Sequence, residues 1–227
     1  MNSLVRVKVC CIQNIDEAKL AIKYGASALG FVSAMPSGPG VIPEDLIEKI
    51  ISEVPPSIGT FLLTSKTDVK SIITQQSKTK ANTIQICDRL QKGTYEELKE
   101  SLPGISIVQV IHVRDESSIE ESINISSKVD GLLLDSGNQT LKIKELGGTG
   151  RTHNWEISRK IVENVNKPVF LAGGLTPENV IEAVDTVKPF GVDVCTGLRI
   201  NGKLNEEKLF IFIFNLTNNY FQSSKNF

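Results

Sequence analysis

The sequence predicts a single-domain α/β protein over residues 1–227, folded as a (β/α)8 barrel, also called a TIM barrel. Short runs rich in Val, Ile and Leu alternate with longer segments of helical periodicity, which is typical of parallel strands joined by helices. Eight strand–helix pairs of about 25 residues each can be counted, and barrels of this class need roughly 200 to 250 residues. No G-x-G-x-x-G turn follows the first strand, which disfavours the alternative, an open doubly wound sheet.

Each predicted strand is one of the apolar runs, and they cover residues 5–12, 28–33, 58–64, 83–87, 105–113, 131–135, 168–172 and 191–195. The predicted helices that follow them in turn cover residues 15–24, 43–54, 68–78, 94–101, 116–128, 154–164, 177–186 and 205–219. Asp16 opens the first helix. Pro43 and Pro177 are expected in first-turn positions, where the missing N–H of proline costs nothing.

The last predicted helix is apolar nearly all round, through Leu209, Phe210, Ile211, Phe212, Ile213, Phe214 and Leu216. A barrel helix that buries its inner side and meets a partner on its outer side has this composition, so a homodimer is one expectation. A helix covered by the C-terminal tail is the other.

The charge balance excludes several kinds of partner. The chain has 25 basic and 26 acidic residues and a net charge of -1, so nothing in its total charge attracts nucleic acid or an anionic membrane. The N-terminal segment has no apolar run of signal-peptide length, and no stretch approaches the roughly 20 apolar residues of a membrane span. We therefore expect a cytoplasmic protein without nucleic-acid or membrane partners.

The four cysteines do not resemble a disulfide framework, because Cys10 and Cys11 are neighbours that cannot readily bridge to each other. They are expected to be reduced thiols. There is no C-x2-C pair, and His112 and His153 show no H-x3-H spacing, so no metal is expected.

Successive side chains of a strand point to opposite faces of the sheet, so some polar side chains are expected to point into the barrel. On the first strand Val7 and Val9 face the helices, so Lys8 and Cys10 point inward. The same reasoning on the fourth, sixth and eighth strands completes a set that converges on one end of the fold: Lys8, Cys10, Gln85, Cys87, Asp135 and Asp193. Because barrel active sites are built at the C-terminal ends of the strands, these residues are candidates for chemistry.

Each candidate also has a purely structural interpretation. A cysteine is often a small buried hydrophobe, and an aspartate that ends an apolar strand often caps the next element. Lys8 and Asp193 can form an internal ion pair that serves packing alone. A carboxylate at a barrel mouth is costly unless it is paired, which favours a functional role for Asp135.

Glycine clusters at three consecutive strand ends are a second signal: Gly147-Gly148-Thr149-Gly150, Gly173-Gly174 and Thr196-Gly197. Glycines permit close backbone approach, and barrels commonly bind phosphate in the loops after strands seven and eight. The sequence therefore predicts a site for a small phosphorylated substrate, held by backbone amides rather than by net charge. Its expected residues are Gly148, Thr149, Gly173, Gly174, Thr196 and Gly197, with Lys8, Gln85 and Asp193 as further substrate-binding candidates.

In combination and order, these pieces resemble the phosphoribosylanthranilate isomerase family over almost the whole chain. The segments that carry the resemblance are Lys8-Val9-Cys10 with Asp16-Glu17-Ala18, Gly25-Ala26 through Leu29-Gly30-Phe31, Leu134-Asp135-Ser136, Gly147-Gly148-Thr149-Gly150, His153-Asn154-Trp155, Leu171-Ala172-Gly173-Gly174-Leu175 and Gly191-Val192-Asp193-Val194. Each piece alone is short, so the specificity lies in the set.

The resemblance implies an Amadori rearrangement of N-(5-phosphoribosyl)anthranilate to the 1-deoxyribulose phosphate, an aldose–ketose isomerisation in tryptophan biosynthesis. It also implies that Cys10 is the general base and Asp135 the general acid, without a cofactor. A thiolate would take the proton from the sugar C2′ while the carboxylic acid protonates the ring oxygen. The nearby Lys8 would stabilise the thiolate.

The chain departs from the family pattern in the part of the site that is expected to bind the anthranilate group of the substrate. Cys11 stands where the family usually has Gly, and Met35-Pro36-Ser37-Gly38-Pro39-Gly40 replaces a Lys-Ser-Pro-Arg-Tyr segment whose arginine meets the anthranilate carboxylate. The family's Gln-Leu-His-Gly is Gln85-Ile86-Cys87-Asp88, and its Ser-Ser-Gly is Cys195-Thr196-Gly197. Two other functions therefore stay open: an isomerase of a related phosphorylated sugar-amine that lacks the carboxylate, and a non-catalytic barrel that binds a phosphorylated ligand.

Overall fold

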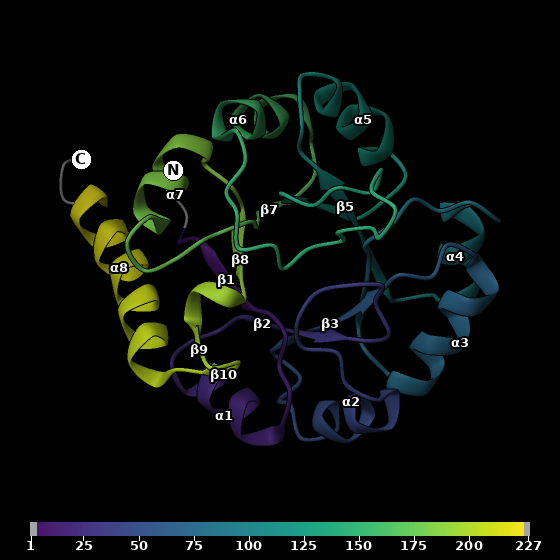
Figure 1. The fold of residues 1–227 in the computed structure, drawn as a ribbon, viewed down its shortest axis with the longest axis horizontal. Helices are drawn as coiled ribbons and strands as arrows, with labels where there is room; N and C mark the ends of the chain where they lie inside the picture. Colours follow the sequence, from purple (N-terminus) through teal and green to yellow (C-terminus); the bar gives the residue numbers. More distant parts are fainter. Residues whose placement is uncertain (1–3, 225–227) are drawn as a thin grey trace.

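The computed structural model describes residues 4–224 and contains a closed barrel of eight parallel strands in sequence order (Figure 1). The strands are β1 (Arg6–Val9), β2 (Ala28–Val32), β3 (Gly59–Thr64), β4 (Thr83–Ile86), β5 (Ser106–His112), β6 (Gly131–Asp135), β7 (Val169–Leu171) and β8 (Gly191–Val194). Lys8 on β1 lies opposite Ala28 on one neighbour and Asp193 on the other, which closes the barrel. The (β/α)8 prediction is confirmed, while the predicted domain ends, Met1 and Phe227, lie outside the described residues.

Figure 1 shows the helices as a ring around the strands. They are α1 (Ile15–Lys23), α2 (Glu44–Ile51), α3 (Val69–Thr79), α4 (Tyr95–Ser101), α5 (Ser117–Ser126), α6 (Trp155–Asn164), α7 (Val180–Val187) and α8 (Glu206–Ser224). The strand–helix alternation read from hydrophobic periodicity therefore holds for every unit, because an apolar stripe on each helix covers the outer face of the sheet.

The helices begin within one residue of their predicted starts, except for α7. Asn14 caps α1, with its Oδ1 accepting the N–H of Glu17 at 2.9 Å, so Asp16 lies in the first turn. Pro43, expected in the first turn of α2, is the extended residue just before it, since its ψ of 144° is not helical. The placement of Pro177 in the first turn of α7 is wrong, because α7 begins only at Val180, after a turn in which Asn179 Oδ1 accepts the N–H of Thr176.

The sequence analysis missed a small hairpin between β8 and α8. A short 3-10 helix, η1 (Thr196–Leu198), leads into β9 (Arg199–Ile200), which pairs antiparallel with β10 (Lys203–Leu204). Asn201 and Gly202 form the turn with positive φ values of 50° and 77°. An Asn-Gly pair is a strong signal for such two-residue turns, so the sequence did carry this information.

Two apolar layers hold the barrel together. The outer layer lies between strands and helices and includes Val7 and Val9, as their alternation predicted. The inner layer fills the barrel, where the rings of Phe61 and Phe170 meet edge to face at 5.8 Å. Polar side chains, including Gln85, Asp135 and Asp193, line a pocket at the C-terminal end of the strands.

Helix α8 buries one face and leaves aromatic side chains on another. Leu209, Phe212 and Leu216 pack on the barrel, whereas Phe210 and Phe214 stack on each other and are about half exposed. Within residues 4–224, no helix combines the length and apolarity needed to cross a bilayer.

The two faces of α8 give a direct test of this packing. Phe212 is 0% exposed and Phe214 is 50% exposed, so Phe212→Ala should lower the free energy of unfolding by about 3 to 5 kcal/mol through loss of burial and an unfilled cavity. The matched variant Phe214→Ala should cost less than half as much. Urea denaturation of both variants measures the difference, and equal losses would show that the assigned faces are wrong.

Candidate active site

One pocket opens at the C-terminal end of the barrel and holds both predicted catalytic side chains, Cys10 and Asp135. It encloses about 650 Å³, its open mouth included, a size suited to a small-molecule ligand. The predicted substrate-binding residues that line it are Gln85, Gly148, Thr149, Gly173, Gly174, Asp193 and Thr196. Segments from across the chain therefore converge on one cavity, as the strand-end argument predicted.

Cys10 lies just beyond β1, where its N–H donates to Val194 O at 2.8 Å. Its Sγ lies 3.5 Å from the ammonium nitrogen of Lys8, so a positive charge faces the thiol from below. Gly30 on β2 provides the room for this pair, because a Cβ at that position would lie 2.7 Å from Cys10 Sγ and 3.0 Å from Lys8 Nζ. The site therefore requires a residue without a side chain on the neighbouring strand.

Lys8 is fully buried beneath the pocket and does not line it. Its Nζ forms an ion pair with Asp193 Oδ1 at 2.8 Å and lies 5.2 Å from the centroid of the Phe61 ring. Burial lowers the pKa of Lys8, but Asp193 and the Cys10 sulfur more than offset this, so the net pKa is raised and the side chain stays an ammonium ion. Lys8 therefore acts on the site through its charge.

Asp135 ends β6 with its carboxyl group at the pocket wall. Oδ1 accepts the N–H of Ser136 at 2.7 Å, which fixes the orientation of the carboxyl. Oδ2 faces Gly147, where a Cβ would lie only 2.7 Å away. Glycine at position 147 therefore leaves the second oxygen accessible from the pocket.

Glycines with free backbone amides line another part of the pocket, beside Asp135. The N–H groups of Gly148, Gly173 and Gly174 have no hydrogen-bond acceptor within the described chain, and all three glycines have positive φ, at 65°, 82° and 62°. Such free amides suit a phosphate group, which accepts several hydrogen bonds at once. Gly197 lies behind this wall, packed against Leu175 so tightly that a Cβ would come within 2.0 Å of the Leu175 carbonyl oxygen.

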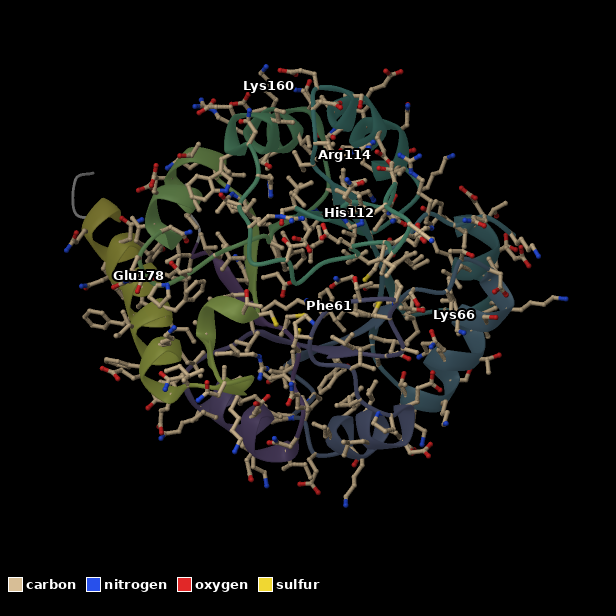
Figure 2. All side chains as sticks on the ribbon, viewed as in Figure 1. Phe61, Lys66, His112, Arg114, Lys160 and Glu178 are labelled. Carbon is tan, nitrogen blue, oxygen red and sulfur yellow. The ribbon has the colours of Figure 1, made fainter. Side chains whose placement is uncertain are left out.

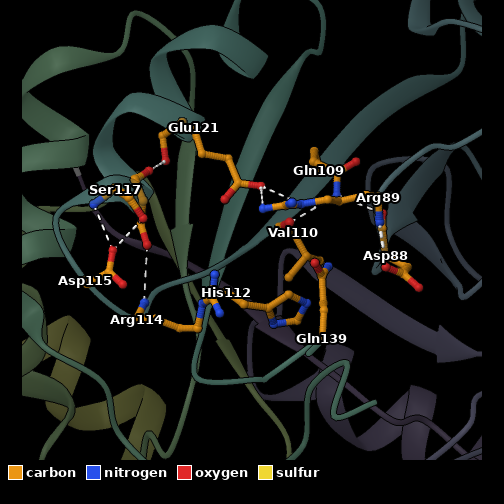
Figure 3. Close-up of polar contacts among 12 residues, drawn as sticks. Asp88, Arg89, Gln109, Val110, His112, Arg114, Asp115, Ser117, Glu121 and Gln139 are labelled. Atoms are coloured by element: carbon orange, nitrogen blue, oxygen red, sulfur yellow. Dashed lines mark hydrogen bonds and ion pairs between the residues drawn. The ribbon is translucent and has the colours of Figure 1, made fainter. Parts of the chain in front are cut away.

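The remaining wall carries no cation. Met35, Ser37, Gly38 and Pro39 of the β2–α2 loop line it, together with Cys87, and no Lys or Arg is among the residues that line the pocket within the described chain. A separate charged cluster lies near the C-terminal ends of β4 and β5, where Arg89 pairs with Glu121 at 2.9 Å and Gln139 lies beside His112 (Figure 3). The His112 ring bonds the Cys87 carbonyl oxygen at 3.0 Å, so it supports the β4 end rather than the pocket surface.

The sequence analysis missed Arg199, which fixes the loop that carries Cys10. Its guanidinium donates to both carboxylate oxygens of Glu17, at 2.9 and 3.1 Å, and to the carbonyl oxygens of Cys10 and Cys11. Glu17 also accepts the N–H groups of Gln13 and Leu204. Burial raises the pKa of Glu17, but the hydrogen bonds from Arg199 and Leu204 outweigh it, so the net pKa is lowered. This buried pair joins the hairpin to the first loop.

Cys11 has a left-handed backbone, with φ at 61°, which is rare for a residue with a side chain. Glycine adopts this conformation without a steric penalty, whereas cysteine does not. Gly40 packs directly on Cys11, since a Cβ at position 40 would lie 2.5 Å from Cys11 Cβ. The chain therefore accommodates the extra side chain with a glycine in the facing loop.

Comparison with known proteins gives a consistent result. Residues 7–215 match the family model for N-(5'-phosphoribosyl)anthranilate isomerase. The chain belongs to this family. It is 36% identical over 220 residues to N-(5'-phosphoribosyl)anthranilate isomerase 2 of Methanosarcina mazei, with 96% of each chain covered. It is also 34% identical over 200 residues to the Haloarcula marismortui isomerase, covering 88% of this chain and 89% of the relative.

Solved structures of the isomerase family show the same barrel. The phosphoribosyl anthranilate isomerase of Thermotoga maritima has a TM-score of 0.77 at 29% identity, covering 94% of this chain and 99% of that one. A second structure, with a TM-score of 0.75 at 27% identity and the same coverage, is a complex with reduced 1-(o-carboxyphenylamino)-1-deoxyribulose 5-phosphate. The family and fold expected from the sequence are thus confirmed, and the chain is related to isomerases.

His153 lies next to Gly173 at the pocket wall. Its Nε2 bonds Ser158 Oγ at 2.7 Å, while its buried Nδ1 has no hydrogen-bond partner among the described residues and lies 3.0 Å from where a Cβ of Gly173 would be. Burial lowers the pKa of His153 to about 4, and the Asp135 charge opposes this only in part. The imidazole is therefore neutral in the folded protein at neutral pH.

This histidine makes stability depend on pH. Its pKa rises toward the ordinary value of 6.5 when the chain unfolds, so the unfolded state binds the extra proton between about pH 6.5 and 4. Stability should therefore fall by about 1 to 3 kcal/mol as the pH drops through this window. Urea denaturation across the window measures the loss, and His153→Phe should flatten it. Parallel curves for the two proteins would exclude His153 as the titrating group.

Proposed function

We propose that this chain catalyses the Amadori rearrangement of N-(5-phosphoribosyl)anthranilate, with Cys10 as general base and Asp135 as general acid. The observation that carries the proposal is the placement of a thiol and a carboxyl in one pocket that is also lined by glycines with free backbone amides. Those amides can anchor the phosphate, so that the sugar is held in the same pocket as the two proton-transfer groups. Membership of the isomerase family supports the same reaction.

The chemistry follows from the two side chains. Asp135 donates a proton to the furanose ring oxygen, which opens the ring to a Schiff base at C1′. The Cys10 thiolate then removes the C2′ proton, and the resulting enol relaxes to the ketone. C2′ is oxidised and C1′ reduced within one molecule, so the enzyme is an intramolecular oxidoreductase among isomerases.

A buried positive charge beneath the pocket stabilises the Cys10 thiolate that removes the C2′ proton. The Lys8 ammonium ion, 3.5 Å from Cys10 Sγ, stabilises negative charge on the sulfur. Asp193 balances Lys8, so the buried charge is not left unpaired. Gln85 lines the pocket with a buried Oε1 that has no partner in the described chain, so it can accept a hydrogen bond from a substrate hydroxyl.

We also propose a cytoplasmic location and a homodimer. All four cysteines are free, and free thiols persist in reducing compartments. The half-exposed Phe210 and Phe214 on α8 form an apolar surface that a second copy can cover. One solved structure is of monomers generated from the dimeric phosphoribosylanthranilate isomerase of Thermotoga maritima.

The absence of a cation among the pocket-lining residues of the described chain favours one alternative function. An anthranilate carboxylate usually needs a charged partner, and here the facing loop offers Ser37, Gly38 and Pro39. A phosphorylated sugar-amine without that carboxylate would fit the same general acid, general base and phosphate-binding amides.

Turnover of phosphoribosylanthranilate, followed by the loss of its fluorescence, tests the proposed function. Cys10→Ser and Asp135→Asn should each lower kcat by at least about 10² to 10⁴, because each removes one proton-transfer group. Cys87→Ser, a change in the same pocket wall without an assigned role, is the matched control and should change kcat less than about 10-fold. Activity that survives both catalytic substitutions would refute the assignment.

The substrate without its carboxylate, N-(5-phosphoribosyl)aniline, separates the two isomerase functions. A preference for the anthranilate of at least about 10² in kcat/KM supports the proposed substrate. Equal or better turnover of the aniline supports the alternative. Turnover of neither compound, together with retained phosphate binding, would identify a non-catalytic barrel.

Inorganic phosphate should protect the fold, because it binds the amide-lined wall of the native state only. At about 100 times its Kd the stabilisation is about 2.7 kcal/mol, which raises the Tm by roughly 5 to 10 °C for a chain of this size. Thermal denaturation with and without phosphate measures the shift. Sodium chloride at matched ionic strength is the control, and an equal shift in chloride would argue against a phosphate site.

A further inference from the structure

A second pocket lies beside the first, at the ends of β4 and β5, and the proposed reaction does not use it. It encloses about 590 Å³, its open mouth included. His112 and Arg114 line it, and Figure 2 shows both on the α5 side of the barrel. All of its lining residues within the described chain are polar or charged, so it suits a polar ligand and not an apolar ring.

The charged side chains of this pocket are not balanced. Lys144 forms an ion pair with Asp88. Arg89 forms another with Glu121 at 2.9 Å. Arg114 forms no ion pair and no side-chain hydrogen bond among residues 4–224. Counted over Lys, Arg, Asp and Glu, three positive and two negative side chains line the pocket, which leaves one positive charge unpaired.

Asp115, the next residue in the chain, does not neutralise Arg114. Its Oδ1 accepts the N–H of Ser117 at 2.9 Å, at the start of α5. The hydrogen bonds from Ser117 lower the pKa of Asp115 more than the Arg114 charge does, and no ion pair joins Asp115 to Arg114 in the part of the chain that the structure describes. The guanidinium is therefore free to bind an anion that enters the pocket.

The unpaired charge selects the class of ligand. A guanidinium binds a carboxylate or a phosphate through two parallel hydrogen bonds. The single charge of a carboxylate balances Arg114, whereas a phosphate ester carries about -1.5 to -2 charges at neutral pH and would leave negative charge beside Asp88 and Glu121. Gln91 and Thr140 line the same pocket, and their side chains can bond the hydroxyl groups of a ligand.

We propose that this pocket binds a small hydroxylated monocarboxylate anchored by Arg114, and that the bound acid strengthens phosphate binding in the active site. The two pockets share a wall at Cys87, which lines the active site. His112 Nε2 donates to the Cys87 carbonyl oxygen at 3.0 Å, and Gln139 Nε2 donates to it at 3.3 Å. Both donors line the second pocket (Figure 3).

The segment between β6 and α6 is a second link between the pockets. Thr140 and Lys144 of this segment line the second pocket, and Gly148 further along lines the active site. The Lys144 carbonyl oxygen accepts the hydroxyl of Ser37 at 2.7 Å, and Ser37 also lines the active site. A ligand that bonds both Arg114 and Thr140 therefore ties this segment to the β5–α5 loop.

This tie gives the effect on the active site its direction. Because a bound ligand raises the population of the conformation that it binds, the acid favours the arrangement in which the Gly148 amide is presented to the active site. The coupling is reciprocal, so phosphate in the active site raises the affinity for the acid by the same factor. This effect rests on the proposed function, whereas binding at Arg114 does not.

Isothermal titration with gluconate, a hydroxylated monocarboxylate, tests the binding. We expect one saturable site with a Kd of about 1 mM, and no saturable binding of sorbitol, which has the same carbon skeleton without the charge. Arg114→Gln should weaken gluconate binding at least about 10-fold, because it removes the charged pair of donors. Arg159→Gln, which removes an exposed arginine on α6, is the matched control and should leave the Kd unchanged.

Saturating gluconate tests the effect on the active site. It should raise the affinity for inorganic phosphate about 5-fold and lower the KM for phosphoribosylanthranilate by a similar factor. Arg114→Gln should show neither change at the same gluconate concentration, because the acid no longer binds.

Several results would overturn the proposal. Sorbitol binding as tight as that of gluconate, gluconate binding that Arg114→Gln leaves unchanged, or no saturation below about 20 mM would exclude the site. Displacement of gluconate by an equal concentration of inorganic phosphate would exclude a carboxylate as the ligand. Unchanged phosphate affinity with gluconate bound would exclude the effect on the active site. If the native chain shows no isomerase activity, the gluconate titration still decides the binding, so a failure of this site is distinguished from a failure of the proposed function.

Discussion

The buried ion pair of Lys8 and Asp193 is the interaction on which the site depends. It joins the first and last strands of the barrel at 2.8 Å and places an ammonium ion 3.5 Å from Cys10 Sγ. A buried charge without its partner costs several kcal/mol, so neither residue is replaceable alone. The pairing of β8 with β1 therefore has two effects. It closes the barrel, and it brings Asp193 to Lys8, whose ammonium group faces the Cys10 thiol.

Much of this arrangement is encoded locally. Alternation along β1 placed Lys8 and Cys10 inside the barrel, and the ends of β6, β7 and β8 placed Asp135 and the glycine loops at one mouth. Such assignments need only strand periodicity and the rule that parallel strands end on the same side. They fail at element ends, as at Pro177, because a turn closed by Thr176 and Asn179 precedes α7 and delays its start to Val180.

Arg199 could not be predicted in this way. Its partners, Glu17 and the carbonyl groups of Cys10 and Cys11, lie more than 180 residues away in sequence, and no periodic pattern links them. Gly197 shows the opposite error, since its place in a glycine cluster suggested contact with substrate, while its close packing on Leu175 puts it behind the pocket wall. Sequence patterns locate the strand ends, and the contacts between loops decide which residues reach the cavity.

The bond from Arg199 to the first loop also bears on how the chain acquires its site during synthesis. Cys10 leaves the ribosome early, but the residues that fix its loop, Asp193 on β8 and Arg199 on β9, emerge only when most of the chain is complete. A nascent chain that ends before β8 has neither the closing strand nor the guanidinium. The thiol is thus among the first groups to be made and among the last to be held in place, so a translation product that ends before β8 carries no formed pocket.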